Sequence, residues 1–477
     1  MFIALPKDTF VRQYGDYTYI FNQRTSSDYV FQDAGVFFEK IGRIPCSKDD
    51  IINNIIEKYD VDKSEVASDF FAIFEPLIKS GVIVASDVPD DIILEKSNET
   101  GSMSADGDFN YNLHNLEYTS QEVMQQYFNA HPTAFVLHCD ITSACTERCI
   151  HCYIPEHKNA HMKTSKIFSV IDEFSELGGL KICFSGGECM LHPDFVKILK
   201  YARQKDLSIS LMSNLTCCDP EMISILKEIN IASLQVSLYS MDSEIHDSIT
   251  QIPGSFKQTI HTLLELHANK IPIQISCPTM KKNYAGYKDV LQFAAQHNIP
   301  AYTDFILMAR SDHSTDNLTQ RLSLREAEYL MRDMLDHSYR YASRILSQTE
   351  FEKIAIPSAD WEEEQICGAG ISSICLNSNG EYYPCAGFQN YPVGNCNKQT
   401  LREVWENSPQ LKYLRSLKRK NLEKCVKCEN RNFCSICLVR NFNENKNMLQ
   451  PNEHYCNIAS INRRLVEEYR AAHENLQ

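Results

Sequence analysis

Between residues 134 and 307, short apolar runs alternate with stretches in which apolar residues recur at helical spacing. The predicted strands are 134–141, 180–185, 207–213, 233–238, 271–278 and 301–307. The predicted helices lie between them, at 164–177, 193–205, 220–229, 256–268 and 287–296. This alternation indicates a parallel sheet with right-handed crossovers. The six units predict an α/β fold, an open, partial (β/α)6 TIM barrel over residues 131–320.

The residues before the barrel follow a different pattern. Residues 9–30 predict strands around a turn, and Ser47 is placed to cap a helix at 51–59. An amphipathic helix at 64–78 and a short strand complete a winged-helix-like α+β domain over residues 1–86. This second helix carries acidic side chains and lacks a basic face, which argues against DNA binding.

Two regions connect the domains. Residues 87–130 mix acidic and small residues with little periodicity, which predicts a linker. Residues 321–365 predict a bridging helical region after the barrel, and a cysteine-rich domain then occupies residues 366–477.

The composition is that of a soluble protein with apolar cores. The 477 residues carry a net charge of −15, which argues against nucleic acid as a partner. We see no signal peptide and no apolar stretch long enough to span a bilayer, so we expect a cytoplasmic protein without a membrane partner. Nineteen cysteines are present, nine of them from Cys367 to Cys456. Clustered cysteines in the reducing cytosol are more often metal ligands or redox groups than disulfides.

A short loop after the first barrel strand carries Cys145, Cys149 and Cys152, spaced C-x3-C-x2-C. Three thiolates in one loop can ligate three irons of a cubane and leave the fourth iron open. A zinc knuckle is the alternative, but it needs a fourth ligand nearby. His151 could be proposed for that role, although a residue between two ligands of a tight loop seldom turns back to the same metal.

Polar and glycine residues follow the next three strands. The second strand ends in Gly186, Gly187 and Glu188, where glycine allows a ligand to approach the backbone and a carboxylate can accept from an ammonium group. The third strand ends in Ser213 and Asn214, and the fourth in Ser237. Each motif alone fits an ordinary strand-to-helix turn, but their order after the cysteine loop favours a nucleoside ligand across the barrel mouth.

These motifs in this order resemble the radical SAM superfamily, whose cofactor is S-adenosylmethionine (SAM). The resemblance implies a 4Fe–4S cluster on Cys145, Cys149 and Cys152, whose open iron chelates the methionyl group of SAM. One electron from the cluster would then cleave the sulfonium to give a 5′-deoxyadenosyl radical. The implied SAM contacts are Tyr153 near the adenine, Gly186, Gly187 and Glu188 at the methionine, and Ser213, Asn214 and Ser237 near the ribose and carboxylate. Cys189 replaces the proline common after Gly-Gly-Glu, and we interpret it as a buried free thiol.

The cysteine-rich end resembles the SPASM extension, which carries two auxiliary 4Fe–4S clusters. The run from Cys425 to Cys437 reads C-x2-C-x5-C-x2-C, one residue shorter in the last gap than the usual pattern. The resemblance implies one auxiliary cluster on Cys425, Cys428, Cys434 and Cys456. It implies another on Cys367, Cys375, Cys385 and Cys437, which makes three 4Fe–4S clusters in all. A pair of zinc ribbons is the alternative for this region. Six further cysteines lie outside these patterns, and we interpret most of them as core thiols: Cys139, Cys183, Cys217, Cys218, Cys277 and Cys396.

Residues 1–86 resemble a PqqD-like peptide-recognition element. Such elements add the leader of a precursor peptide as a strand at a sheet edge. The three modules together resemble maturases of ribosomally made peptides, and we expect a precursor peptide bound through its leader. An electron donor such as ferredoxin or flavodoxin is implied. The leading hypothesis is a Cys-to-carbon thioether cross-link in that peptide.

Several alternatives stay open at this point. An anaerobic sulfatase-type maturase that oxidises Ser or Cys shares the cysteine-rich end, and carbon–carbon cross-linking or epimerisation of a peptide is a related activity. A non-enzymatic alternative is an iron–sulfur electron carrier or redox regulator. Asp304 and Arg310, near the last strand end, are weak candidates for substrate contact, because such residues more often form a salt bridge or cap a loop.

Overall fold

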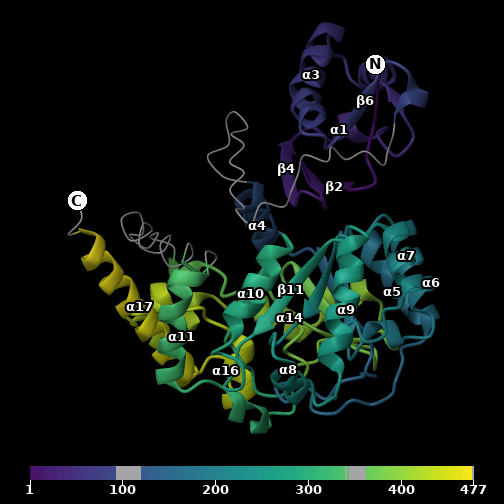
Figure 1. Ribbon diagram of the computed structural model, residues 1–477. Coiled ribbons are helices and arrows are strands. Elements are labelled where there is room, and N and C mark those ends of the chain that lie inside the picture. The colour runs from purple at the N-terminus through teal and green to yellow at the C-terminus, as the bar shows by residue number, and fades with distance from the viewer. Residues whose placement is uncertain (93–119, 339–340, 343–360, 475–477) are drawn as a thin grey trace.

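A computed structural model describes residues 1–92, 120–338, 341–342 and 361–474. Its centre is a nine-stranded sheet, in which six strands run parallel and neighbour one another in chain order (Figure 1). These are β7 (Val136–Thr142), β8 (Lys181–Gly186), β9 (Ser208–Ser213), β10 (Ser233–Ser237), β11 (Ile273–Pro278) and β12 (Ala301–Asp304). The helices after them are α5 (Thr164–Glu176), α6 (Phe195–Gln204), α7 (Pro220–Ile229), α8 (Ser243–Thr250), α9 (Ser255–Ala268) and α10 (Tyr287–Gln296). The predicted α/β alternation is confirmed, with α8 as an added short helix.

The side chains of β7 alternate between the two faces of the sheet, and the two faces differ in polarity. Leu137, Cys139 and Ile141 are buried in the main core together with apolar residues of the covering helices. His138 and Asp140 occupy the alternate positions and therefore lie on the other face. The helices thus cover one face of the sheet, and polar groups gather on the other.

Three strands that sequence reasoning did not find extend this sheet beyond β7. They are β13 (Ser373–Leu376), β14 (Glu381–Tyr383) and β15 (Gly394–Asn395). β13 is parallel to β7, with Cys375 beside His138, whereas β14 and β15 are antiparallel. The sheet is therefore mixed, and the cysteine-rich domain contributes directly to it.

The rest of the cysteine-rich domain is helical. Its helices are α13 (Leu401–Asn407), α14 (Pro409–Ser416), α15 (Glu423–Val426), α16 (Leu438–Asn445) and α17 (Glu453–Glu474). α11 (Leu324–His337), in the predicted bridging region, packs beside α17 (Figure 1). Short 3-10 helices are η1 (Pro89–Asp91), η2 (Cys189–Leu191), η3 (Asp316–Gln320), η4 (Trp361–Glu363), η5 (Arg419–Asn421) and η6 (Arg431–Phe433). Within the predicted bridging region, residues 339–340 and 343–360 lie outside the described residues.

Residues 1–86, which we call the front module, form a separate α+β unit with its own core. One small sheet contains β1 (Phe2–Ala4), β5 (Cys46–Ser47) and β6 (Val84–Ser86), and another contains β2 (Thr9–Tyr14), β3 (Tyr17–Asn22) and β4 (Ser27–Gln32). The helices are α1 (Gly35–Phe38), α2 (Lys48–Lys58) and α3 (Lys63–Lys79). The predicted cap is confirmed, since the Ser47 hydroxyl accepts from the Asp50 amide at 3.0 Å.

The prediction of a linker over residues 87–130 is wrong at its end. Residues 120–130 form the helix α4 (Ser120–Ala130). Val123, Met124 and Phe128 of this helix pack with aromatic residues of β2 and β3 in a small core. Val123, Met124, Tyr127 and Phe128 do recur at helical spacing, but this periodicity is confined to one short stretch at the end of a polar segment. The part of the predicted linker from 93 to 119 lies outside the described residues.

The front module contacts the turns that precede the barrel strands. The Tyr14 hydroxyl donates to the Gly178 carbonyl at 2.7 Å, and Gln23 donates to the Asn230 carbonyl at 2.9 Å. Both acceptors lie just before a strand, so the module sits at the amino-terminal end of the parallel strands. Figure 1 shows it at the top, whereas α8, which follows β10, lies at the bottom. Among the described residues, no helix is long and apolar enough to cross a membrane.

Candidate active site at the carboxyl end of the sheet

The cysteine loop follows β7 and is fastened to the end of β8 by backbone contacts. The amide of Gly187 donates to the Thr142 carbonyl at 3.0 Å, and that of Glu188 donates to the Ala144 carbonyl at 2.7 Å. A Cβ atom on Gly187 would lie 2.1 Å from the Ala144 oxygen. Gly186 has a φ of +123°, and a Cβ there would lie 2.1 Å from the Thr142 oxygen. Both glycines are required because the two strand ends approach each other closely.

Glu188 is fully buried behind this contact and joins β8 to β9. Its carboxylate accepts from the Ser213 hydroxyl at 3.0 Å, from the Asn214 amide at 2.9 Å and from the Met190 amide at 3.1 Å. Burial raises the pKa of Glu188, and these hydrogen bonds oppose the shift. Here the carboxylate therefore holds two strand ends in register, in addition to the methionine contact predicted for it.

Asn214 and Ser237 reach the cysteine loop from the next two strand ends. The Asn214 amide side chain donates to the Thr146 hydroxyl at 2.9 Å, and its nitrogen lies 3.9 Å from the Cys145 sulfur. Ser237 hydrogen-bonds the Tyr239 hydroxyl, which lies 3.7 Å from the Cys149 sulfur. Tyr239 was not predicted, because nothing in the local sequence indicates that this residue reaches a loop 90 positions earlier.

The three thiols lie in a poorly hydrated place. Burial raises the pKa of Cys145 to about 12 and also raises those of Cys149 and Cys152. Burial likewise raises the pKa of Glu147, between two of the cysteines, to about 7. A bound metal deprotonates a coordinating thiol outright, so these groups suit an iron cluster better than they suit free thiolates.

Buried polar atoms without a partner surround the same loop. Among the described residues, they include Glu147 Oε1, His151 Nδ1 and His157 Nδ1. A buried polar atom left unpaired is costly, so these atoms mark a place where a bound group belongs. The donor set of three thiols and the unpaired atoms around them fit an iron–sulfur cluster with a polar cofactor.

Tyr153 lies between the cysteine loop and the cysteine-rich domain. Its side chain is partly buried, and desolvation, with Asp140, Cys152, Cys375 and Cys385 as charged neighbours, raises its pKa. The contact of Tyr153 with the adenine stays a prediction. The position does show that the loop and two of the predicted auxiliary ligands share one neighbourhood.

The cysteines of the C-terminal domain gather in two sets. Burial raises the pKa of Cys367 to about 11, and the neighbouring thiols of Cys437 and Cys385 add to this effect. Cys375 is buried and interacts with Cys385 in the same way. We call Cys367, Cys375, Cys385 and Cys437 the proximal set, because it adjoins β7.

The second set lies farther along the chain. Burial raises the pKa of Cys434 to about 11, and Cys456, Cys425 and Cys428 contribute as neighbours. We call Cys425, Cys428, Cys434 and Cys456 the distal set. Within the described ranges, no group of three His, Cys, Asp or Glu side chains is arranged to hold a single metal ion. A cubane spreads its thiolates over separate irons, so its ligands need not converge on one point.

A buried acid–histidine pair on β7 was missed in the sequence. His138 Nε2 and Asp140 Oδ1 lie 3.0 Å apart, and Gln389 donates to the other Asp140 oxygen at 3.1 Å. Burial lowers the pKa of His138, but Asp140 and Cys183 outweigh it, so the pKa rises well above its usual value. Polar residues at alternating positions of an otherwise apolar strand were the available signal. The pair lies on the face of the sheet that carries Cys375 and can hold a proton there.

The two weak substrate candidates have structural partners. Arg310 forms an ion pair with Asp316 at 3.0 Å and also lies near Cys152. Asp304 Oδ1 accepts from the Ile306 amide at 2.6 Å, which is a loop cap. Cys189 is buried as predicted, and Cys139, Cys277 and Cys396 are also core thiols.

The comparisons with known proteins agree with this geometry. Residues 140–294 match the Radical SAM superfamily, and residues 367–429 match an iron–sulfur cluster-binding domain known as SPASM. Over residues 140–294 the chain is similar to the Radical SAM superfamily, and the protein is an enzyme. The matched ranges contain the cysteine loop, three of the four cysteines of the proximal set and two of the four of the distal set.

Curated relatives are about a quarter identical to this chain over the residues that align. An "AdoMet-dependent heme synthase" of Methanosarcina barkeri is 25% identical over 66% of this chain and 94% of its own. The "antilisterial bacteriocin subtilosin biosynthesis protein AlbA" of Bacillus subtilis is 26% identical over 64% of this chain and 68% of its own.

Solved structures show the same fold. The crystal structure of Streptococcus suis SuiB bound to precursor peptide SuiA has a TM-score of 0.59 at 15% identity, covering 92% of this chain and 96% of that one. The anSMEcpe structure with bound AdoMet has a TM-score of 0.55 at 16% identity and covers 71% of this chain and 93% of that one. The match to SuiB therefore extends over nearly the whole chain.

Proposed function

We propose that this enzyme cross-links a ribosomally synthesised precursor peptide, with a Cys-to-carbon thioether as the product. The supporting observation is the combination of a radical SAM domain, two further cysteine sets and a front module in one chain. The fold of SuiB, a protein crystallised with its precursor peptide, covers 92% of this chain. AlbA, named for the biosynthesis of a bacteriocin, is a relative by sequence.

The residues of the carboxyl end have distinct parts in this proposal. Cys145, Cys149 and Cys152 hold a 4Fe–4S cluster, which with bound SAM supplies a 5′-deoxyadenosyl radical. Asn214 and Tyr239 orient the cysteine loop through the contacts described above. The proximal and distal sets hold two auxiliary clusters, and a ferredoxin or flavodoxin is the proposed electron donor.

The proposed reaction removes two hydrogens from the peptide. The radical would take one hydrogen atom from carbon and end as 5′-deoxyadenosine, and the cysteine thiol of the peptide would lose its proton as the carbon–sulfur bond forms. The peptide would thus lose two electrons, one with the hydrogen atom and one to an auxiliary cluster. The electron that cleaves SAM would come from the cluster on Cys145, Cys149 and Cys152, which the electron donor would reduce again.

The remaining parts of the proposal concern recognition and architecture. The front module acts as a PqqD-like element that binds the leader, in a cytoplasmic enzyme. The six parallel strands curve into the partial barrel predicted from the sequence, with the substrate entering at their carboxyl ends.

The decisive test is anaerobic reconstitution with iron, sulfide, reductant and SAM, followed by mass analysis of a co-expressed precursor peptide. A loss of two hydrogens that blocks alkylation of one cysteine supports the thioether. An unchanged mass with altered stereochemistry indicates epimerisation, and a two-hydrogen loss with every thiol still alkylated indicates a carbon–carbon bond. Oxidation of a single Ser or Cys to formylglycine would support the sulfatase-type alternative.

A second candidate function comes from the sequence relatives. The proteins named AdoMet-dependent heme synthases align over 84–94% of their own length. Their alignments span about two thirds of this chain, so they do not account for all of it. Incubating the reconstituted enzyme with a heme precursor in place of peptide, and following the pigment by mass spectrometry, separates the two functions.

A further inference from the structure

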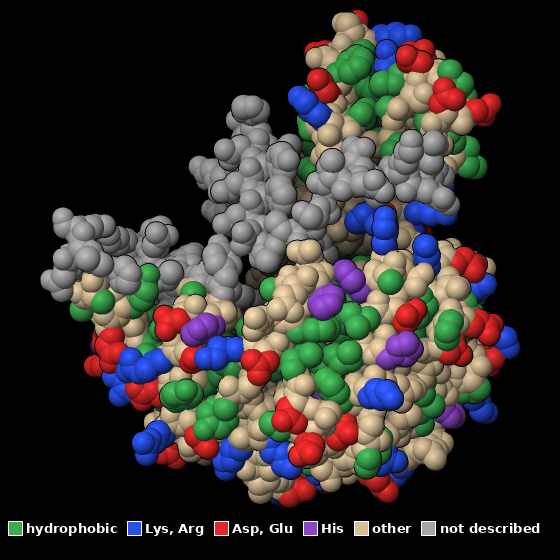
Figure 2. All heavy atoms as spheres, in the orientation of Figure 1, with side chains coloured by type: hydrophobic (Ala, Val, Ile, Leu, Met, Phe, Trp, Pro, Cys, Tyr) green, Lys and Arg blue, Asp and Glu red, His purple; other side chains and the backbone are tan. Residues whose placement is uncertain are grey.

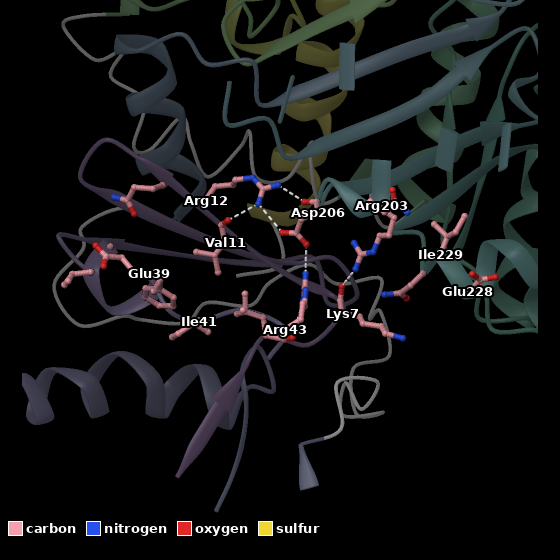
Figure 3. Close-up of a pocket in the computed structure, with 18 of the residues that line it drawn as sticks. Lys7, Val11, Arg12, Glu39, Ile41, Arg43, Arg203, Asp206, Glu228 and Ile229 are labelled. Carbon is pink, nitrogen blue, oxygen red and sulfur yellow. Dashed lines mark hydrogen bonds and ion pairs between the residues drawn. The ribbon is translucent and has the colours of Figure 1, made fainter. Parts of the chain in front are cut away.

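Most charged side chains of this enzyme lie at the surface, close to charges of opposite sign. On the face drawn in Figure 2, Lys and Arg side chains are interspersed with Asp and Glu side chains. Figure 3 shows two partly buried arginines, Arg12 and Arg43, directed at Asp206, at 3.3 and 2.8 Å. Arg440, on the first turn of α16, differs from these. It is 6% exposed, the most deeply buried Lys or Arg of the described residues, and no ion pair joins it to a described carboxylate.

The guanidinium of Arg440 is fixed by residues that adjoin two cysteines of the distal set. It donates to the carbonyl of Ser435, the residue after Cys434. Its central carbon lies 4.1 Å from the ring centroid of Tyr455, the residue before Cys456. Arg440 and Cys434 also line one cavity of about 260 Å³. Burial raises the pKa of Cys434, and the charge of Arg440 opposes that shift, so the two side chains are close enough to interact.

A second arginine over the same ring does have a carboxylate partner. Arg321 lies 5.3 Å from the ring centroid of Tyr455 and donates to Glu444 at 2.9 Å. Asp304 lines the cavity with Arg440, but no ion pair joins these two side chains. The described residues thus supply a carboxylate for one of the two arginines and none for the other. A buried charge without a partner is strongly destabilising, so the opposite charge beside Arg440 is expected to come from a bound group.

We infer that Arg440 is the counterion of an iron–sulfur cluster on the distal set and stabilises the reduced form of that cluster. Four thiolates give a bound cubane a net negative charge, which grows when the cubane takes up an electron. A fixed cation beside it therefore favours reduction and raises the midpoint potential. The inference rests on the proposed function, in which the distal set binds a cluster and an auxiliary cluster accepts one electron from the peptide. Arg440 contacts neither SAM nor the peptide and acts through the cluster.

The test is a redox titration of the full-length reconstituted enzyme, followed by electron paramagnetic resonance. The signal of the distal cluster is identified as the one that Cys434→Ala abolishes. In Arg440→Gln, the ratio of reduced to oxidised distal cluster at a fixed potential should fall about tenfold, which corresponds to a midpoint about 59 mV lower for a one-electron couple. Arg440→Lys keeps the positive charge and should change the same ratio less than about threefold.

A charge-neutral double variant is the matched control. Arg321→Gln combined with Glu444→Gln removes an ion pair beside the same Tyr455 ring and leaves the net charge of the region unchanged. The midpoint of its distal cluster should equal that of the wild type. Iron analysis of each preparation shows whether the distal cluster is present. If Arg440→Gln binds no distal cluster, Arg440→Lys is decisive, because a retained charge should retain both the iron and the midpoint.

The inference is overturned if Arg440→Gln has full iron content and an unchanged distal midpoint. It is also overturned if the double variant shifts the midpoint as far as Arg440→Gln does, since packing rather than charge would then set the potential. Release of 5′-deoxyadenosine and cross-linking of the peptide are measured on the same preparations. An enzyme whose distal midpoint depends on Arg440 but which forms no cross-link contradicts the proposed function alone. An enzyme that cross-links its peptide while Arg440→Gln keeps the wild-type midpoint contradicts the role of Arg440 alone.

Discussion

The two ends of the parallel sheet are built in different ways. At the carboxyl end, Gly186 and Gly187 bring two backbones into direct contact, and the buried Glu188 locks the adjoining strand ends. At the amino end, the front module is attached through side chains that are partly exposed, such as Asp206, whose side chain is 46% exposed. The cysteine loop therefore has little room to move. The front module is held by ion pairs that solvent weakens together with a small buried core that its Phe10 and Tyr14 share with Leu180.

The largest effect is expected at the cysteine loop. Replacing Cys145, Cys149 and Cys152 together with alanine should abolish 5′-deoxyadenosine release, because the ligands of the proposed cluster are gone. Iron analysis should show a loss of about four iron atoms per chain, while the iron of the two proposed auxiliary clusters is retained. If the triple variant still releases 5′-deoxyadenosine, the assigned site is wrong.

The distal set should give the next largest effect. Cys434→Ala should lower the iron content by about four atoms and reduce cross-linked product by about tenfold or more, while SAM cleavage continues. The control is Cys396→Ala, which removes a buried core thiol outside both sets and should keep all the iron. An equal iron content in the two variants would show that Cys434 is not a ligand of a cluster.

A single methyl group tests the contact between the strand ends. Gly187→Ala places a carbon 2.1 Å from the Ala144 oxygen and 2.9 Å from the Cys145 Cβ, so the loop must shift. We expect a loss of about 1–3 kcal/mol in the free energy of unfolding and weaker SAM cleavage. Gly42→Ala is the control, since nothing lies within 4 Å of its added carbon. Denaturant unfolding compares the two variants, and equal stability would show that the loop tolerates the displacement.

The smallest effect is expected at the amino end. Asp206→Asn removes the carboxylate shared by Arg12 and Arg43, and partly exposed pairs of this kind contribute about 0–1 kcal/mol each. Hydrogen exchange should become faster in β2 and remain unchanged in β7. Glu406→Gln, at an exposed pair on α13, should change neither strand. Unchanged exchange in β2 would mean that apolar packing alone holds the module.

The sequence predicted the alternation of strands and helices well because each of these elements is defined by local periodicity. It also predicted the cysteine loop and the glycine segment from spacing. The missed parts depend on contacts between distant residues. Tyr239 reaches Cys149 through the arrangement of strand ends, and α4 is held by packing on the front module. The four residues of β13 are too short to show a period.

The pairing of β13 with β7 also affects how the chain can fold. Leu376 lies beside Cys139, although 376 − 139 = 237 positions separate them in the chain. During synthesis, one edge of β7 stays without its partner strand β13 until the cysteine-rich domain has left the ribosome. An unpaired edge in a half-made sheet is prone to associate with other chains, so this enzyme is expected to need chaperone protection until its last third is made.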